Sequence, residues 1–146
     1  MAKVCEISHF WVFTALVRYR VSMATKNVSE NDFAQLIEEN DIVLVDFWAA
    51  WCGPCRQFAP VYEQTSEKFT DVVFAKVDTE AEQGLARAAN VTSIPTIMAF
   101  REKVLVFSQA GALNASQLED LVTAVKGIDM GEVHAQIAQE AAQAES

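Results

Sequence analysis

Residues 47–56 read Phe-Trp-Ala-Ala-Trp-Cys-Gly-Pro-Cys-Arg, and the rest of the chain is organised around this stretch. An apolar run, Ile42–Trp48, leads into this stretch, and a helix-like pattern follows it. Cys52 and Cys55 therefore stand where a buried strand turns into a helix. In α/β proteins the carboxyl end of a strand is where ligands and chemistry gather. A C-x-x-C spacing beside such a pattern predicts a redox pair.

The spacing of the two cysteines has a chemical reason. Cys52 is expected at the N-terminus of the helix, where free N–H groups and the helix dipole favour the thiolate, which is the reactive form. Cys55 lies about one turn further on the same face, so it can attack a mixed disulfide formed by Cys52. Pro54 suits the first turn of a helix, and Gly53 gives a tight turn backbone freedom.

Length and composition narrow the classes of function. The chain has 146 residues, which predicts one domain with a real core. Its net charge of −9 argues against nucleic acid or an anionic membrane as the main partner. Three cysteines are too few for a disulfide scaffold, which favours a cytosolic protein with a working redox pair over a secreted one.

Residues 1–22 differ from the rest of the chain. Their apolar run, residues 10–17, is far shorter than the roughly 20 residues that a membrane span needs. We expect either that translation begins at Met23 or that residues 1–22 are a disordered or non-native leader; a targeting segment and a structured addition are the alternatives. A zinc site that joins Cys5 and His9 to the C-x-x-C pair is conceivable, but the spacing matches no standard finger.

Two motifs together resemble the thioredoxin family. Residues 48–55 are similar to its active-site sequence, and residues 94–96, Ile-Pro-Thr, are similar to its second signature. The resemblance covers about residues 28–126. It implies the α/β thioredoxin fold: a mixed central sheet of about five strands flanked by helices on both faces, in the order β-α-β-α-β-α-β-β-α. We assign residues 23–127 to this domain and residues 128–146 to a C-terminal extension that forms a frayed or partner-dependent helix.

The resemblance also implies a function. Cys52 is expected to be the nucleophile and Cys55 the resolving thiol of a protein-disulfide reductase that maintains cell redox homeostasis. Its electrons would come from NADPH through thioredoxin reductase. The protein itself would bind no metal and no cofactor. Its partners would be the reductase and disulfide-containing target proteins, and we expect a monomer in the cytoplasm.

Two charged residues interrupt apolar strands. Asp46 is costly in such surroundings unless it is paired, hydrated or protonated. It either faces solvent near the strand end or is a buried acid; the resemblance implies the second, with Asp46 moving the proton of Cys55 through water. Lys76 is either a snorkelling lysine on a solvated edge or an electrostatic neighbour of Asp46. We rank Lys76 below Asp46 as a functional residue.

The resemblance implies an apolar rim where targets dock. Pro95 would be cis, against the alternative of an ordinary trans turn proline, and Ile94 would offer backbone hydrogen bonds to an extended segment. Gly111 would let a partner approach, or it is simply a turn glycine. Ser93 replaces a glycine that is frequent in the family, which could narrow the choice of partner. The residues assigned to the rim are Trp51, Gly53, Pro54, Ile94, Pro95 and Gly111.

Two other functions compete with the reductase. A disulfide oxidase or isomerase needs a more oxidising pair, and Gly53-Pro54 argues against it because such relatives tend to place a histidine between the cysteines. A binding protein without electron transfer is the second alternative, with the acidic tail as a docking element.

Local patterns add smaller expectations. Capping patterns at residues 29–32, 79–82 and 114–117 predict helix starts. A hairpin turn around Lys103 lacks the glycine that is usual in the family. His134 has no visible partner in the sequence and is expected to be a surface histidine.

Overall fold

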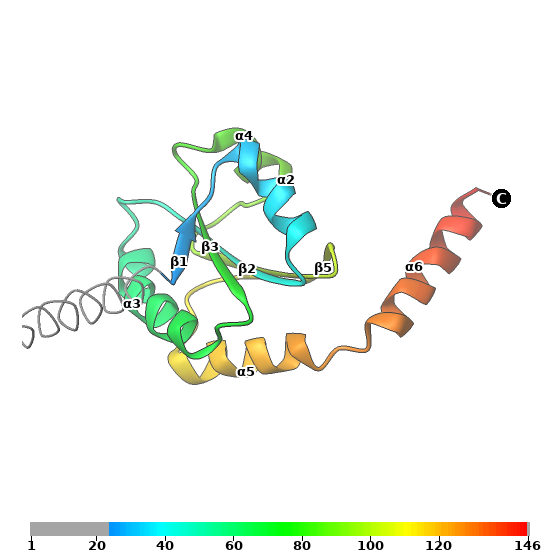
Figure 1. The fold of residues 1–146 in the computed structure, drawn as a ribbon. Coiled ribbons are helices and arrows are strands. Elements are labelled where there is room, and N and C mark those ends of the chain that lie inside the picture. Colours follow the sequence, from blue (N-terminus) through cyan, green and yellow to red (C-terminus); the bar gives the residue numbers. More distant parts are fainter. Residues whose placement is uncertain (1–23, 146) are drawn as a thin grey trace, which may run out of the picture.

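The computed structural model describes residues 24–145 and contains one mixed five-stranded sheet (Figure 1). The strand order is β1-β3-β2-β4-β5. Strands β1, β3 and β2 are parallel, whereas β4 runs antiparallel to both β2 and β5. The predicted order of elements and the mixed sheet are confirmed. The strands are β1 (Thr25–Asn27), β2 (Ile42–Trp48), β3 (Val73–Asp78), β4 (Thr96–Arg101) and β5 (Val104–Ala110).

Helices cover both faces of the sheet, as expected. Two helices pack their apolar side chains against one face, and two others cover the opposite face. No helix among residues 24–145 is long and apolar enough to cross a membrane. The first face carries α3 (Gly53–Lys68) and α5 (Ala115–Lys126), the second carries α2 (Glu30–Glu39) and α4 (Gln83–Ala88), and the last helix is α6 (Met130–Ala144).

Strand β2 lies at the centre of the molecule. It pairs with β3 on one side and β4 on the other, and every residue from 42 to 47 is buried. Residues 43 and 45 pack on the α2 side and residues 42 and 44 on the α3 side, because side chains alternate along a strand. Burial on both faces explains the nearly continuous apolar run in the sequence. The strand ends beside Cys52, so the core of the fold fixes the position of the cysteine pair.

The three capping patterns have different outcomes. At residues 114–117 the structure forms a complete capping box, with Asn114 as the N-cap of α5. Ser29 is the N-cap of α2, but its hydroxyl donates to the side chain of Asp32 instead of capping the backbone. The pattern at residues 79–82 is wrong as a capping box, because α4 begins only after Glu82. Ser29 and Asn114 share the extended N-cap backbone, but only the pattern at residues 114–117 forms both hydrogen bonds of the box.

Helix α6 occupies the C-terminal extension and stands apart from the sheet (Figure 1). Asp129 caps it by accepting from the N–H of Glu132, and Met130 is buried. The guanidinium of Arg101 donates to two carbonyl oxygens at the end of α5 and to one in the α5–α6 connection, at 2.7 to 2.8 Å. These contacts anchor the start of the helix, while its fraying without a partner stays a prediction.

The β4–β5 turn holds two residues other than glycine in the left-handed region. Glu102 has a φ of 48° and Lys103 a φ of 70°. In this region a residue with a side chain is less favourable than glycine by about 1–2 kcal/mol. Glycine, however, loses more conformational entropy on folding, which offsets part of that difference. We expect Lys103→Gly to raise the free energy of unfolding by about 0.5–1 kcal/mol, measured by urea denaturation. Lys103→Ala is the control, because it removes the charge but keeps the strain; equal stability of the two variants would contradict the prediction.

Candidate active site

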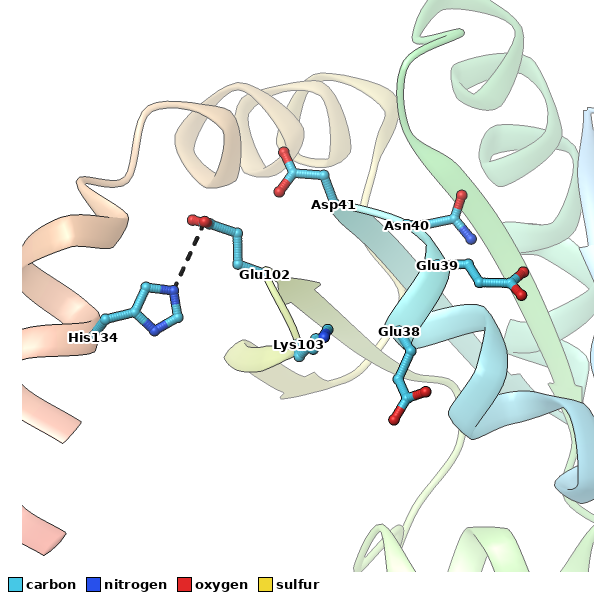
Figure 2. Close-up of a pocket in the computed structure, with 7 residues that line it drawn as sticks. All are labelled: Glu38, Glu39, Asn40, Asp41, Glu102, Lys103 and His134. Carbon is cyan, nitrogen blue, oxygen red and sulfur yellow. Dashed lines mark ion pairs between the residues drawn. The ribbon is translucent and has the colours of Figure 1, made fainter. Parts of the chain in front are cut away.

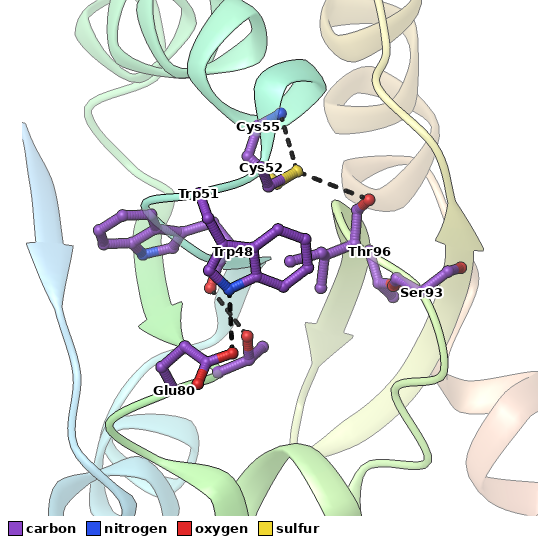
Figure 3. The surroundings of a disulfide bond; sticks show 9 residues. Trp48, Trp51, Cys52, Cys55, Glu80, Ser93 and Thr96 are labelled. Atoms are coloured by element: carbon purple, nitrogen blue, oxygen red, sulfur yellow. Dashed lines mark hydrogen bonds between the residues drawn. A yellow bond between two sulfur atoms is a disulfide. The ribbon is translucent and has the colours of Figure 1, made fainter.

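The cysteine pair lies at the junction of β2 and α3, and the pair is oxidised to a disulfide (Figure 3). The Cα atoms are 5.2 Å apart. Cys52 is the N-cap of α3, and its Sγ accepts a hydrogen bond of 3.2 Å from the N–H of Cys55. That N–H and the helix N-terminus favour negative charge on Cys52 in the reduced protein. The helix-start position predicted for Cys52 is confirmed.

The two cysteines are buried, whereas the tryptophan that precedes them is exposed. Cys52 and Cys55 are only 4% and 2% exposed, whereas Trp51 is 66% exposed. The indole N–H of Trp51 donates to the carboxylate of Glu80 at 3.0 Å, which fixes the ring beside the disulfide (Figure 3). An exposed indole held in one orientation is a ready contact surface for a partner.

The first turn of α3 carries the other two residues of the motif. Pro54 occupies the first turn, as expected. Gly53 does not need its conformational freedom, since its φ is not positive, so the explanation from a tight turn is wrong. A Cβ at Gly53 would meet no atom within 4 Å. Its small size leaves the surface open beside the cysteines.

The loop before β4 lies against the disulfide. The Ile94–Pro95 peptide bond is cis, the isomer that the resemblance implies. The carbonyl oxygen of Ile94 lies 3.8 Å from Sγ of Cys52. Gly111 donates its N–H to the carbonyl of Pro95 at 2.8 Å, and its φ of +107° is one that side chains rarely adopt. Gly111 is thus both a turn glycine and a direct neighbour of this loop.

A shallow groove runs beside the disulfide, and Ser93 is one of the residues that line it. Ser93 also accepts, through its carbonyl, a hydrogen bond from the hydroxyl of Thr96 at 2.5 Å. The groove combines apolar walls with three hydroxyl groups. Its lining residues are Trp51, Thr79, Ala86, Val91, Thr92, Ser93 and Ile94.

Asp46 is a buried acid, so the interpretation that it faces solvent is wrong. It is 1% exposed, and neither carboxylate oxygen has a hydrogen-bond partner among residues 24–145. Burial raises its pKa from 3.8 to about 7, and the charge of Lys76 partly opposes that rise. A pKa near neutrality is one that a proton-transfer group needs at physiological pH.

The position of Asp46 relative to Cys55 follows from the packing. Asp46 lies on the same face of β2 as Leu44, because side chains alternate. Leu44 packs with Phe58 of α3, which lies about one turn beyond Cys55 on the same helix face. The carboxyl group therefore lies under the helix face that carries Cys55.

Lys76 lies directly opposite Asp46 in the β2–β3 pairing. Strand β3 is flanked by β1 and β2, so the expectation of a lysine on a solvated sheet edge is wrong. Its Nζ lies 4.9 Å from the ring centroid of Trp48, a cation–π contact that holds the ammonium near the acid.

Two residues of the site were not anticipated from the sequence. Glu80 holds Trp51, and the phenol of Tyr62 reaches the carbonyls of Leu44 and Ala75 at 3.1 and 2.8 Å. The position of Glu80 could have been predicted. Glu80 follows the carboxyl end of β3 and Trp51 follows that of β2, and because parallel strands end at the same edge of a sheet, the two residues are expected to lie close together. Tyr62 gave no such signal, since its pattern was that of any core residue.

No group of three or more metal-ligating side chains occurs among residues 24–145. Cys5 and His9, the other members of the conceivable zinc site, lie outside the described residues, as does the segment 1–22.

Comparison with known proteins gives a consistent result. The sequence pattern of the Thioredoxin family matches residues 24–124. Putative thioredoxin 2 of Streptomyces coelicolor is 48% identical over 121 residues, which are 83% of this chain and 90% of the relative. Thioredoxin 1 of Plasmodium falciparum is 39% identical over 94 residues, 64% of this chain and 89% of the relative.

Solved structures agree with the sequence comparison. The structure of Plasmodium falciparum thioredoxin superposes with a TM-score of 0.65 at 39% identity, covering 68% of this chain and 98% of the other. A mutant thioredoxin of Halobacterium salinarum gives a TM-score of 0.67 at 33% identity, covering 73% of this chain and 96% of the other.

Proposed function

The chain belongs to the thioredoxin family and is a dithiol–disulfide reductase with a redox-active cysteine pair; from this premise we propose that Cys52 is the attacking thiol and Cys55 the resolving one. The observation that carries this assignment is the N-cap position of Cys52, whose sulfur accepts from the N–H of Cys55. Within the Cys52–Cys55 pair this stabilisation acts on Cys52, so Cys52 is the better thiolate.

The reaction then has two exchange steps. The Cys52 thiolate attacks one sulfur of the target disulfide, that S–S bond breaks, and the other target sulfur leaves as a thiolate. Cys55 next attacks Sγ of Cys52, which breaks the mixed disulfide and releases the second target thiolate. The target gains two electrons, and the protein is left with the Cys52–Cys55 disulfide.

Asp46 supplies the proton transfer for the second step. Cys55 must lose a proton before it can attack, and the carboxylate beneath α3 accepts that proton through water. Lys76 adjusts the acid electrostatically, since its charge favours the ionised form of Asp46. Burial of the acid and its pKa of about 7 support these two roles.

Targets dock on the rim around the disulfide. Trp51, Gly53 and Pro54 supply one side, and the loop of Ile94 and Pro95 supplies the other. The backbone of Ile94 pairs with an extended segment of the target, in the manner of an added strand. Gly111 keeps the approach to Pro95 open. Ser93 adds a hydroxyl to the same groove and restricts which segments fit.

The wider setting follows from the family. Thioredoxins bind no cofactor of their own and act on disulfide-containing targets, usually with a reductase. We propose that NADPH supplies the electrons through thioredoxin reductase, that the protein works as a monomer in the cytoplasm, and that residues 23–127 are the catalytic domain.

The reduction potential of the pair tests the proposal against its rivals. We expect roughly −270 mV, from equilibration in dithiothreitol or glutathione buffers and counting of free thiols by alkylation and mass spectrometry. Pro54→His is the matched variant: a cationic side chain near the thiolate should raise the potential. A wild-type value of roughly −120 to −180 mV would support an oxidase or isomerase instead. Failure of the cysteines to pair would leave the binding role.

A further inference from the structure

Helix α6 lacks the burial that normally stabilises a helix of its length. Every side chain from residue 134 to residue 145 is exposed. Isolated helices of about 12–15 residues are marginal in water, and most gain their stability by packing an apolar face. The start of α6 is fixed to the domain through Met130 and the cap at Asp129. An anchored helix with an uncovered surface is suited to receive a partner.

One face of α6 combines a histidine with apolar residues, and the histidine reaches the β4–β5 turn of the domain. His134, Ile137, Ala138 and Ala141 follow the spacing i, i+3, i+4 and i+7, which places them on one face. His134 forms an ion pair, at 3.8 Å, with Glu102 of the β4–β5 turn (Figure 2), a partner that was not visible in the sequence. Its side chain is 48% exposed, so the prediction of a surface histidine is confirmed. Ile137 is 44% exposed on this face.

A pocket separates α6 from the end of the sheet, and its lining is mostly acidic (Figure 2). The lining includes four carboxylates, one lysine and one histidine. The lining residues are Glu38, Glu39, Asn40, Asp41, Glu102, Lys103 and His134.

We propose that this acidic groove, defined as the pocket together with the His134–Ile137 face of α6, binds a cationic amphipathic helix of a partner protein. The apolar face of such a helix would cover Ile137, and its lysines or arginines would meet the carboxylates of the pocket. A second copy of this chain fits less well. Helix α6 contains Glu132 and Glu140 but no lysine or arginine, so two copies would bring like charges together.

The groove is remote from the redox chemistry. It adjoins Asp41, at the start of β2, whereas Cys52 follows the other end of that seven-residue strand. At about 3.3 Å per residue the two ends are roughly 20 Å apart. A partner held in the groove leaves the disulfide and its rim open, so the chain can be tethered and still exchange disulfides.

Binding of a designed peptide to the full chain tests the proposal. The probe is a fluorescein-labelled peptide with two copies of Leu-Lys-Lys-Leu-Leu-Lys-Leu, which contains no cysteine, and the readout is fluorescence anisotropy. We expect saturable binding that weakens about tenfold in Glu38→Gln/Glu102→Gln and several-fold in Ile137→Ser. The matched control is Glu67→Gln/Asp120→Asn, which removes the same charge from exposed positions on α3 and α5 and should change the affinity less than about twofold.

Three results would overturn the proposal: no saturable binding, an equal loss in the control variant, or a wild-type dimer that dissociates in Ile137→Ser by sedimentation analysis. Circular dichroism and disulfide reductase activity show that each variant is folded. Because the probe has no cysteine, Cys52→Ser should bind it like the wild type. Failure here would therefore leave the redox assignment untouched.

Discussion

Cys55→Ser should stop turnover while leaving the first exchange step intact. Cys52 keeps its N-cap position and the N–H at residue 55, so its thiolate still attacks target disulfides. Without a resolving thiol the mixed disulfide accumulates. Attack by Cys55 within the same molecule corresponds to an effective thiol concentration of about 10⁵ M or more, so a thiol in solution resolves the mixed disulfide far more slowly. We expect multiple turnover to fall at least about 10³-fold, with one target molecule trapped per chain.

The trapped species can be measured directly. Intact mass spectrometry after incubation with insulin should show the variant joined to an insulin chain, and dithiothreitol should release it. Cys52→Ser is the matched control and should trap nothing, because Cys55 lies within the first turn of α3 and does not have the N-cap position that favours the thiolate of Cys52. Trapping by Cys52→Ser instead of Cys55→Ser would reverse the two roles.

The chemistry of this molecule was predictable because it depends on local geometry. The apolar run Ile42–Trp48 predicts β2 to the residue, since a strand buried on both faces needs no polar alternation. The cysteine spacing and Pro54 then fix the start of α3. These features involve residues that are close in sequence, so the local sequence pattern is enough to predict them.

Contacts between distant segments were not predictable in the same way. Glu80 reaches Trp51 across 29 positions of sequence, and His134 of α6 reaches Glu102 of the β4–β5 turn. The same limit applies to Asp46. The sequence left its burial open, since that depends on how α3 covers the sheet.

The second large effect concerns Asp46 and the pH dependence of stability. Its folded-state pKa of about 7 lies above its ordinary value of 3.8 because the charged form is buried. The folded state therefore binds one more proton than the unfolded state between these two values. This contribution to stability is fully present below pH 3.8 and is lost as the pH rises through about 7.

Asp46→Asn should remove that dependence. Each pH unit in the window is worth about 1.4 kcal/mol, so the free energy of unfolding of the wild type should fall relative to the variant by about 3 kcal/mol between about pH 4.5 and pH 8.5. Urea denaturation at a series of pH values measures the difference, and other titrating groups cancel in the comparison. A constant difference would mean that Asp46 does not titrate in this range.

The same titration should appear in the kinetics of the second exchange step. If the carboxylate accepts the proton of Cys55, the rate rises through about pH 7 in the wild type, and Asp46→Asn lowers it about 10²-fold and removes the inflection. Stopped-flow measurement of release of the second target thiol gives both quantities. Lys76→Met is the sharper control, because loss of a charge that lowers the pKa of Asp46 should move the inflection upward without abolishing it. An inflection that survives in Asp46→Asn would belong to another group, whereas one that disappears there and shifts in Lys76→Met ties the burial of one carboxyl to both stability and catalysis.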